Sequence, residues 1–277
     1  MPLLKIILLA LVQGAAELLP VSSSAHVVVA ERLLGIDPAS PEATLLLVIL
    51  HTGTMLAVVL YFWKRWKVAL VASRAAALVS VRLVAISTAL TGLIGFGSKV
   101  LVEKTMLRGQ PKAEIEQLFG NLLLVAIAMG AAGILILVAG LRRPTQEREI
   151  KPTDAVWVGL VQGLCLPFRG FSRSGATISV ALLRNLARSR AEEFSFALAV
   201  VLTPPVLWRE FHRLQAAGIS PQGSLVLAYT LGFVCSFLAG LAALKWLSRW
   251  LETGRWYLFG VYCLLASGCV LLLHSQR

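Results

Sequence analysis

Three polar side chains stand close together in an otherwise apolar N-terminal segment of this sequence. Glu17 is followed within ten residues by Ser23 and His26, with Pro20 between them. A carboxylate, a hydroxyl and an imidazole at this spacing can supply a metal ligand, a nucleophile and a base. An ionisable side chain is costly to place in a long apolar segment of the kind that crosses a membrane, so any such residue is a candidate for function. We predict that Glu17, Ser23 and His26 form a catalytic group, with Glu17 also acting as a metal ligand.

The polar residues near this group have simple structural interpretations beside the functional ones. Gln13 lies four residues before Glu17, on the same helix face, and is predicted to bind substrate. Ser22 and Ser24 are predicted to bind substrate too, although serines before a helix are also ordinary N-caps. For His51, which stands alone in a long apolar segment, we favour a structural role.

A second polar run lies in the middle of the chain. Arg173 is flanked by serines and followed by glycine at the expected start of a helix. A guanidinium presents a fork of donors that matches phosphate oxygens, and the N–H groups at a helix start add a positive dipole end. We predict Arg173 to be catalytic. The predicted substrate-binding residues of this run are Arg169, Ser172, Ser174, Gly175 and Thr177.

The composition is that of a membrane protein. Of 277 residues, 57% are hydrophobic and 14% charged, and the mean hydropathy is +0.79, whereas soluble domains carry roughly 25% charged residues. The net charge of +12 comes from Lys and Arg clustered between apolar segments, which is typical of contact with anionic lipid rather than nucleic acid. The four cysteines lie in apolar segments without metal-ligand spacing, so we expect neither disulfides nor a zinc site.

The elements that position the two polar runs are expected to be helical hairpins. The first pairs an apolar segment 3–19 with a short helix 25–35, and the second pairs 155–168 with 175–187. None of these arms comfortably reaches the ~20 residues needed to cross a bilayer. We therefore predict re-entrant hairpins, with two full spans per hairpin as the competing interpretation. Full spans are predicted at about 43–63, 82–100, 119–141, 194–211, 224–244 and 256–274.

The chain also repeats itself. Leu11-Val12-Gln13-Gly14 recurs as Leu160-Val161-Gln162-Gly163, and each half holds a hairpin followed by three spans. An odd number of spans inverts the second half, so the hairpin tips can meet near the midplane. The predicted fold is an all-α integral membrane protein, a single domain 1–277 built of two inverted repeats, about 1–142 and 153–277. The meeting of Glu17, Arg173 and two helix starts would suit a pyrophosphate bound with a divalent cation, Mg²⁺ or Ca²⁺.

Three motifs carry a resemblance to a known family. They are Glu17-Leu-Leu-Pro-Val-Ser-Ser-Ser-Ala-His26, Ser172-Arg-Ser-Gly-Ala-Thr-Ile-Ser179 and Glu193-Phe-Ser-Phe-Ala-Leu-Ala199. Together they resemble the undecaprenyl-pyrophosphate phosphatases, also called bacitracin-resistance proteins, and the match covers essentially the whole chain. The resemblance implies a multi-pass enzyme of the bacterial inner membrane that hydrolyses the C55 lipid pyrophosphate to its monophosphate at a site open to the periplasm. It also implies a part in peptidoglycan synthesis, cell wall biogenesis, cell shape and bacitracin resistance.

The resemblance assigns the family's functional residues to positions in this chain. Its second glutamate falls on Glu17, its serine on Ser23, its histidine on His26 and its arginine on Arg173. The sequence also departs from the family. The first of the family's two glutamates is Gln13 here, Ala25 replaces a glycine, and Pro-Gly-Thr before the second motif is Arg169-Gly170-Phe171. Arg169 adds a second cation beside the expected phosphate pocket, which could shift substrate preference or compensate for altered metal binding.

We therefore predict an undecaprenyl-diphosphate phosphatase whose partners are a polyprenyl pyrophosphate and bilayer lipid, with a homodimer left open. In-line transfer would use Arg173 and a cation on Glu17 to stabilise charge, while Ser23 or His26 attacks or activates water. Two alternatives stay open. One is a transporter or flippase that moves a lipid phosphate without hydrolysis, and the other is a phosphatase acting on another lipid phosphate.

Overall fold

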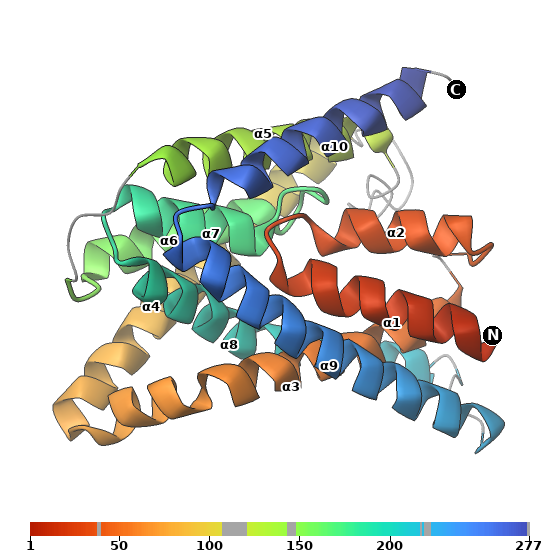
Figure 1. The fold of residues 1–277 in the computed structure, drawn as a ribbon, viewed down its shortest axis with the longest axis horizontal. Coiled ribbons are helices and arrows are strands. Elements are labelled where there is room, and N and C mark those ends of the chain that lie inside the picture. Colours follow the sequence, from red (N-terminus) through yellow and green to blue (C-terminus); the bar gives the residue numbers. More distant parts are fainter. Residues whose placement is uncertain (38–39, 107–120, 143–147, 217, 219–222, 276–277) are drawn as a thin grey trace. The chain divides into compact units, whose positions relative to one another are not determined.

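The computed structural model describes residues 1–37, 40–106, 121–142, 148–216, 218 and 223–275, and the described regular structure is entirely helical. The polar stretch 142–154 is predicted to link the two halves of the sequence. The start of the expected span 119–141 and residues 143–147 of this polar linker lie outside the described residues. The helices are α1 Leu3–Leu18, α2 Ser23–Leu33, α3 Pro41–Val71, α4 Arg74–Met106, α5 Leu122–Leu141, α6 Pro152–Cys165, α7 Arg173–Leu183, α8 Arg188–Ala216, α9 Gly223–Glu252 and α10 Tyr257–Ser275. The all-α prediction is confirmed (Figure 1).

The long helices are those of an integral membrane protein. Five of them, α3, α4, α5, α8 and α9, are long and apolar enough to cross a bilayer, and a shorter apolar stretch, Tyr257–Leu272, lies in α10. The predicted spans 43–63, 82–100, 194–211 and 224–244 lie within α3, α4, α8 and α9, and the described part of 119–141 and the span 256–274 match α5 and α10 to within a residue. Large apolar side chains such as Leu93 and Phe96 are more than two-thirds exposed, as is expected where hydrocarbon rather than water surrounds a helix.

The four hairpin arms are all short. Helices α1 and α2 have 16 and 11 residues, and α6 and α7 have 14 and 11, against the ~20 residues that a span requires. These lengths favour hairpins over pairs of full spans. Pro20 follows α1 and Pro167 follows α6, where a residue without a backbone donor ends the helix.

The described helices form two compact units, and each unit combines elements from both halves of the sequence. The first comprises Met1–Leu19, Ser23–Lys67 and Ala199–Leu247, and the second comprises Pro20–Ser22, Val68–Leu198 and Ser248–Arg277. The first unit therefore holds most of the first hairpin with α3 and α9. The second unit holds the second hairpin with α4, α5 and α10.

In the first unit, α1 and α3 both pack closely on α9. A Cβ atom on Gly14 would lie 2.6 Å from the Ser236 carbonyl oxygen, and one on Gly53 would lie 2.6 Å from the Phe233 carbonyl oxygen. The buried Ser236 hydroxyl donates to the Leu50 carbonyl at 2.9 Å. Small residues that allow close backbone approach are the usual basis of helix packing in membranes, so α9 fixes α1 relative to α3.

In the second unit, α6 packs on α4 by the same means. A Cβ atom on Gly159 would lie 2.7 Å from the Ser87 carbonyl oxygen, and the Ser87 hydroxyl donates to the Ala155 carbonyl at 2.6 Å. Gln162 donates to the Thr91 hydroxyl at 3.1 Å. Helices α5 and α10 also lie side by side, and the Ser267 hydroxyl donates to the Ala126 carbonyl at 2.7 Å (Figure 1).

The repeated Leu-Val-Gln-Gly sequence has the same packing role in both units. Gly14 contacts α9 and Gly163 contacts α4, in which a Cβ on Gly163 would lie 2.7 Å from the Ile94 Cβ. Helices α4 and α9 hold the same place in the order of their halves. The two repeated glycines thus pack alike, and the inverted structural repeat stays a prediction.

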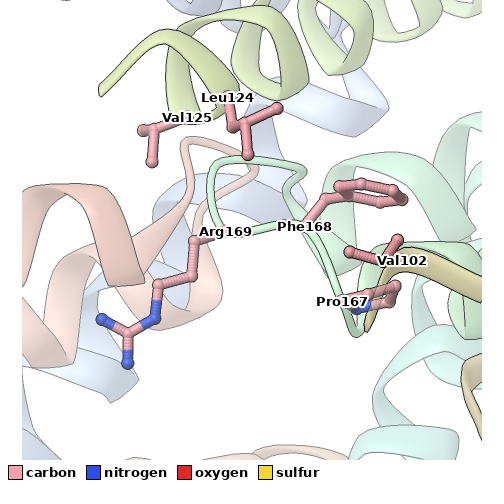
Figure 2. A pocket seen from close by; sticks show the side chains of 6 residues that line it. All are labelled: Val102, Leu124, Val125, Pro167, Phe168 and Arg169. Carbon is pink, nitrogen blue, oxygen red and sulfur yellow. The ribbon is translucent and has the colours of Figure 1, made fainter. Parts of the chain in front are cut away.

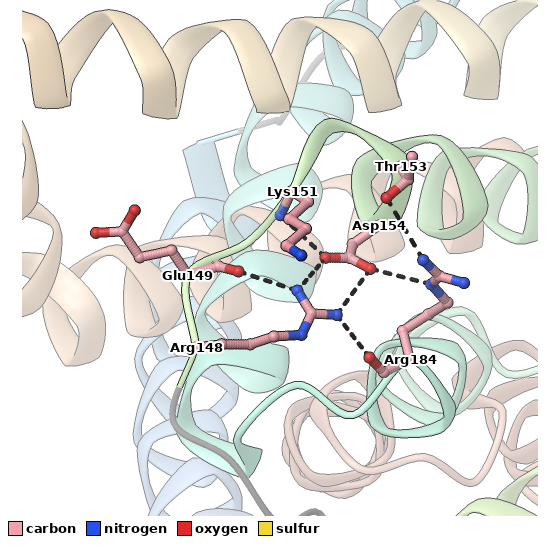
Figure 3. Close-up of polar contacts among 6 residues, drawn as sticks. All are labelled: Arg148, Glu149, Lys151, Thr153, Asp154 and Arg184. Atoms are coloured by element: carbon pink, nitrogen blue, oxygen red, sulfur yellow. Dashed lines mark hydrogen bonds and ion pairs between the residues drawn. The ribbon is translucent and has the colours of Figure 1, made fainter.

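Both hairpins are tied at their open ends by a basic side chain. Lys5 of α1 donates to the Leu34 carbonyl just after α2. In the second hairpin, Arg148 donates to the Arg184 carbonyl at 2.6 Å and to both carboxylate oxygens of Asp154, at 2.6 and 3.0 Å (Figure 3). The Arg184 guanidinium reaches the same carboxylate at 3.0 Å. One buried acid therefore joins the start of α6 to the end of α7.

The pKa of Asp154 follows from these contacts. Burial alone would raise the pKa, but the hydrogen bonds from Arg148, the Lys151 backbone and Arg184 outweigh burial, so the pKa is lowered from its ordinary 3.8. The pairing therefore stabilises the folded protein fully above the unfolded value. That contribution is lost as the pH falls through the lower folded value.

Replacing Asp154 by Asn should lower stability by roughly 2–3 kcal/mol, less than the loss of a fully buried pair because both arginines are partly exposed. Thermal melting in detergent near neutral pH measures the effect, and the difference from wild type should shrink only below about pH 4. Glu149→Gln is the matched control, because only its backbone carbonyl contacts Arg148 and its side chain points away from the cluster in Figure 3. Equal melting of Asp154→Asn and wild type would contradict this role.

Candidate active site

The first hairpin brings Ser23 and Glu17 into direct contact. The Ser23 hydroxyl donates to the Oε2 atom of Glu17 at 2.6 Å. Ser22, just before it, has a φ of 68°, a left-handed backbone conformation that is uncommon outside glycine. This turn lets the chain reverse within a few residues and start α2 at Ser23. Backbone strain of this kind is often found at functional sites.

Two further side chains approach the same carboxylate oxygen. Gln13, one turn earlier on α1 and buried, has its Nε2 atom 3.3 Å from Glu17 Oε2. His51 of α3 has its Nε2 atom 3.5 Å from it. The Glu17 side chain is only 16% exposed, so these contacts take the place of water around its carboxylate. The predicted grouping of Glu17, Ser23 and Gln13 at one place agrees with these contacts.

His51 is the residue that the sequence interpretation undervalued. A lone histidine in an apolar span carries no local pattern that points to a partner, and its contact with Glu17 arises only from the packing of α1 and α3 on α9. The signal that could have singled it out is the scarcity of ionisable residues within membrane segments.

The remaining predicted residues of this hairpin lie on or beside the start of α2. His26 lies three residues after Ser23, on the same helix face, and is half-buried. Ser24 is half-buried as well, and Ser22 is buried at the turn. Their roles in catalysis and substrate binding stay predictions.

The second hairpin presents the start of α7. Ser172 is the N-cap and accepts a hydrogen bond from the Gly175 backbone N–H at 3.2 Å, and Arg173 is the first helical residue. A Cβ atom on Gly175 would lie 2.7 Å from the Ile136 Cδ1 atom of α5, so a side chain there would displace Ile136. Arg173 is half-buried, while Ser174 is buried. A helix start beside a guanidinium is a suitable anion site.

Thr177 is held inside the second unit. Its hydroxyl is 2.6 Å from the Ser195 hydroxyl of α8 and donates to the Arg173 carbonyl at 2.8 Å. Both side chains are almost fully buried. Ser195 belongs to the Glu193–Ala199 motif, so this hydrogen bond between Thr177 and the motif fastens α7 to α8. The predicted contact of Thr177 with substrate stays a prediction.

The loop before α7 requires glycine at its tip. Gly170 has a φ of 103°, and an added Cβ would collide with the Val125 carbonyl oxygen of α5. Beside it lies a small apolar pocket lined by Val102, Leu124, Val125, Pro167, Phe168 and Arg169 (Figure 2). Figure 2 shows the Arg169 side chain directed away from Phe168, Pro167 and Val102, so its guanidinium does not face these apolar residues.

The first hairpin offers too few oxygen ligands to hold a divalent cation such as Mg²⁺ by itself. Oxygen atoms of the substrate phosphates would have to complete the coordination. In the described part of the chain no three His, Cys, Asp or Glu residues gather as a metal site. Glu17, the Gln13 amide and the Ser23 hydroxyl offer oxygen atoms of the kind that Mg²⁺ and Ca²⁺ bind, and Mg²⁺ commonly combines one carboxylate with substrate phosphates and water. Glu17 and Ser23 belong to the first compact unit and Arg173 to the second, and the meeting of these side chains stays a prediction.

Comparison with known proteins decides the family. The family model described as "Bacitracin resistance protein BacA" matches residues 6–269. The chain belongs to this family. It is 51% identical over 280 residues to "Undecaprenyl-diphosphatase 2" of Acinetobacter baylyi, covering 99% of this chain and 98% of that protein. It is also similar to proteins named "Undecaprenyl-diphosphatase" from Desulfosudis oleivorans, 33% identical with 96% of each chain covered, and Rhodopirellula baltica, 31% identical with 99% of each covered.

Family membership gives these residues a chemical context. The predicted resemblance to bacitracin-resistance proteins is confirmed, and it extends over nearly the full length of the BacA relatives. The motifs that carried the resemblance, around Ser23 and Arg173, are the two hairpin tips described above.

Proposed function

We propose that this protein is an undecaprenyl-diphosphatase that hydrolyses the C55 lipid pyrophosphate to the monophosphate and inorganic phosphate. Near-complete alignment with relatives of that name supports the activity. The Ser23–Glu17 hydrogen bond of 2.6 Å carries the chemical argument. The enzyme would act as a multi-pass protein of the bacterial inner membrane with its site open to the periplasm, returning carrier lipid to peptidoglycan synthesis.

Ser23 is the nucleophile and Glu17 its general base in this proposal. A hydroxyl is a weak nucleophile until an adjacent base removes its proton, and the two groups must lie within hydrogen-bond reach. Ser23 Oγ attacks the terminal phosphorus while its proton passes to Glu17 Oε2. The bond from that phosphorus to the bridging oxygen breaks, and the lipid monophosphate leaves. Water then attacks the phosphoserine phosphorus, the bond from phosphorus to Ser23 Oγ breaks, and Oγ takes back the proton held by Glu17 as inorganic phosphate leaves.

His26 serves the second step. It lies one helical turn from Ser23 on α2, and its imidazole can accept a proton from water. The direct contact with Glu17 favours Ser23 over His26 for the first step.

The second hairpin binds the phosphates. Phosphoryl transfer depends on positioning and on stabilising negative charge at the equatorial oxygens. Arg173 supplies a fork of donors, and the α7 start adds a positive dipole end. Ser172 and Ser174 flank it, and Arg169 adds a second cation on the same loop. The polyprenyl tail would lie among apolar side chains.

Ser23→Ala and Glu17→Gln should each lower kcat about 100-fold or more, because each removes one half of the nucleophile and base pair. Phosphate release from C55 pyrophosphate in detergent measures this. The controls are Ser80→Ala on α4 and Glu210→Gln on α8, where the first side chain bonds its own helix and the second forms an i,i+3 pair with Arg213. Normal turnover in both site variants would overturn the assignment, and lipid movement without phosphate release would indicate a transporter.

A divalent cation on Glu17 would neutralise charge on the substrate phosphates when bound. Glu17 would hold it with substrate oxygens, because the site offers a single carboxylate. We expect EDTA to abolish phosphate release and Mg²⁺ or Ca²⁺ to restore it. Full turnover in chelator would contradict the cation proposal while leaving the Ser23–Glu17 pair intact.

A further inference from the structure

Three groups converge on one oxygen atom of Glu17, and they come from three different helices. Ser23 of α2, Gln13 of α1 and His51 of α3 lie 2.6, 3.3 and 3.5 Å from Oε2. Ser23 and Gln13 belong to the motif of the first hairpin. His51 lies outside both motifs, and nothing in the reaction described so far uses it.

The His51 ring is held in one orientation by its own helix. Its Nδ1 atom is 2.8 Å from the Leu47 carbonyl oxygen, which can only accept a hydrogen bond, so Nδ1 is the donor. The other ring nitrogen, Nε2, lies 3.5 Å from Glu17 Oε2. Because a carboxylate oxygen only accepts, Nε2 donates to it in the protonated ring, where both nitrogens are donors. A histidine whose second nitrogen is engaged in this way is a well-oriented partner for a functional group.

The backbone beneath His51 is fixed as well. Gly53, two residues on, contacts the Phe233 carbonyl of α9, and the Leu50 carbonyl accepts the Ser236 hydroxyl. Gly14, next to Gln13, packs on the same part of α9 at Ser236. Helix α9 thus sets the spacing between the helix that carries Glu17 and the helix that carries His51.

We propose that His51 is a positioning residue of this site, whose Nε2 holds the Glu17 carboxylate in line with the Ser23 hydroxyl. This inference rests on the proposed function and deepens it. The carboxylate has no acidic neighbour at residue 13, where the family resemblance places a second glutamate and this chain has Gln13. The Gln13 amide and His51 both approach Glu17 Oε2, so Ser23 receives its base at a fixed place.

The expected consequence is a change in rate rather than in substrate affinity. Without His51 the carboxylate can turn away from Ser23, and misplacement of a catalytic group by about 1 Å can cost roughly 100-fold. His51→Leu should therefore lower kcat roughly 10- to 100-fold, with KM unchanged within about twofold. His51→Gln keeps a nitrogen donor at similar reach and should restore most of the rate.

The experiment measures kcat and KM for phosphate release from C55 pyrophosphate, with thermal melting of each purified variant. Thr52→Ala is the matched control on α3, because its exposed hydroxyl bonds only the Val48 carbonyl of its own helix. His212→Gln controls for loss of a histidine elsewhere, since its ring packs on Trp208 of α8. Both controls should match wild type.

Each result has a defined meaning. Normal kcat in folded His51→Leu, equal losses in His51→Gln and His51→Leu, or a raised KM with normal kcat would each overturn the positioning role. If His51→Leu fails to fold, His51→Gln is compared with the shorter His51→Asn, and equal rates in these two would overturn it. A wild-type protein that releases no phosphate would overturn the proposed function and this inference together, whereas normal His51→Leu turnover would remove this inference alone.

Discussion

A single carboxylate surrounded by apolar helices constrains the whole first hairpin. An ionised acid in such surroundings is costly unless hydrogen-bond donors and charges compensate it. Glu17 is compensated at one oxygen by groups from three helices, Ser23, Gln13 and His51. The left-handed turn at Ser22 and the glycine contacts of α1 and α3 with α9 are the means by which the backbone brings these groups together.

The first hairpin carries a negative charge that must be compensated, whereas the second hairpin presents hydrogen-bond donors and positive charge. Its tip is shaped by Gly170, whose positive φ no other residue adopts easily, and by the Ser172 cap of α7. Its open end is held by the Asp154 cluster, where one buried acid is paired with two arginines. In both hairpins, then, a fixed open end leaves the tip for chemistry.

Local patterns predicted the parts of the fold that depend on local physics. The proline breaks and the polar runs in apolar sequence gave both hairpins and the Glu17–Ser23 group. The helix ends were less accurate, because α3 continues to Val71 whereas the span was predicted to end near residue 63. A hydropathy pattern predicts only the part of a helix that lies in hydrocarbon. Polar residues that favour helix, such as Lys64 and Lys67, continue the helix beyond that part.

Contacts between distant segments could not be predicted in the same way. The pairing of His51 with Glu17 depends on two glycines that pack on α9, and the sequence of α3 alone favoured a structural histidine. Asp154 appeared only as the end of a polar linker, since its partners Arg148 and Arg184 are joined to it by the folded hairpin. Thr177 was predicted from its place in a motif, while its bond to Ser195 depends on how α7 meets α8.

The stereochemical course at the terminal phosphorus tests the central claim most directly. With a terminal thiophosphate made chiral by two oxygen isotopes and hydrolysed in water of the third, the account predicts overall retention of configuration in the released thiophosphate, because attack by Ser23 and then by water inverts the centre twice. Overall inversion would mean that water attacks directly, and would contradict the role assigned to the Ser23–Glu17 pair.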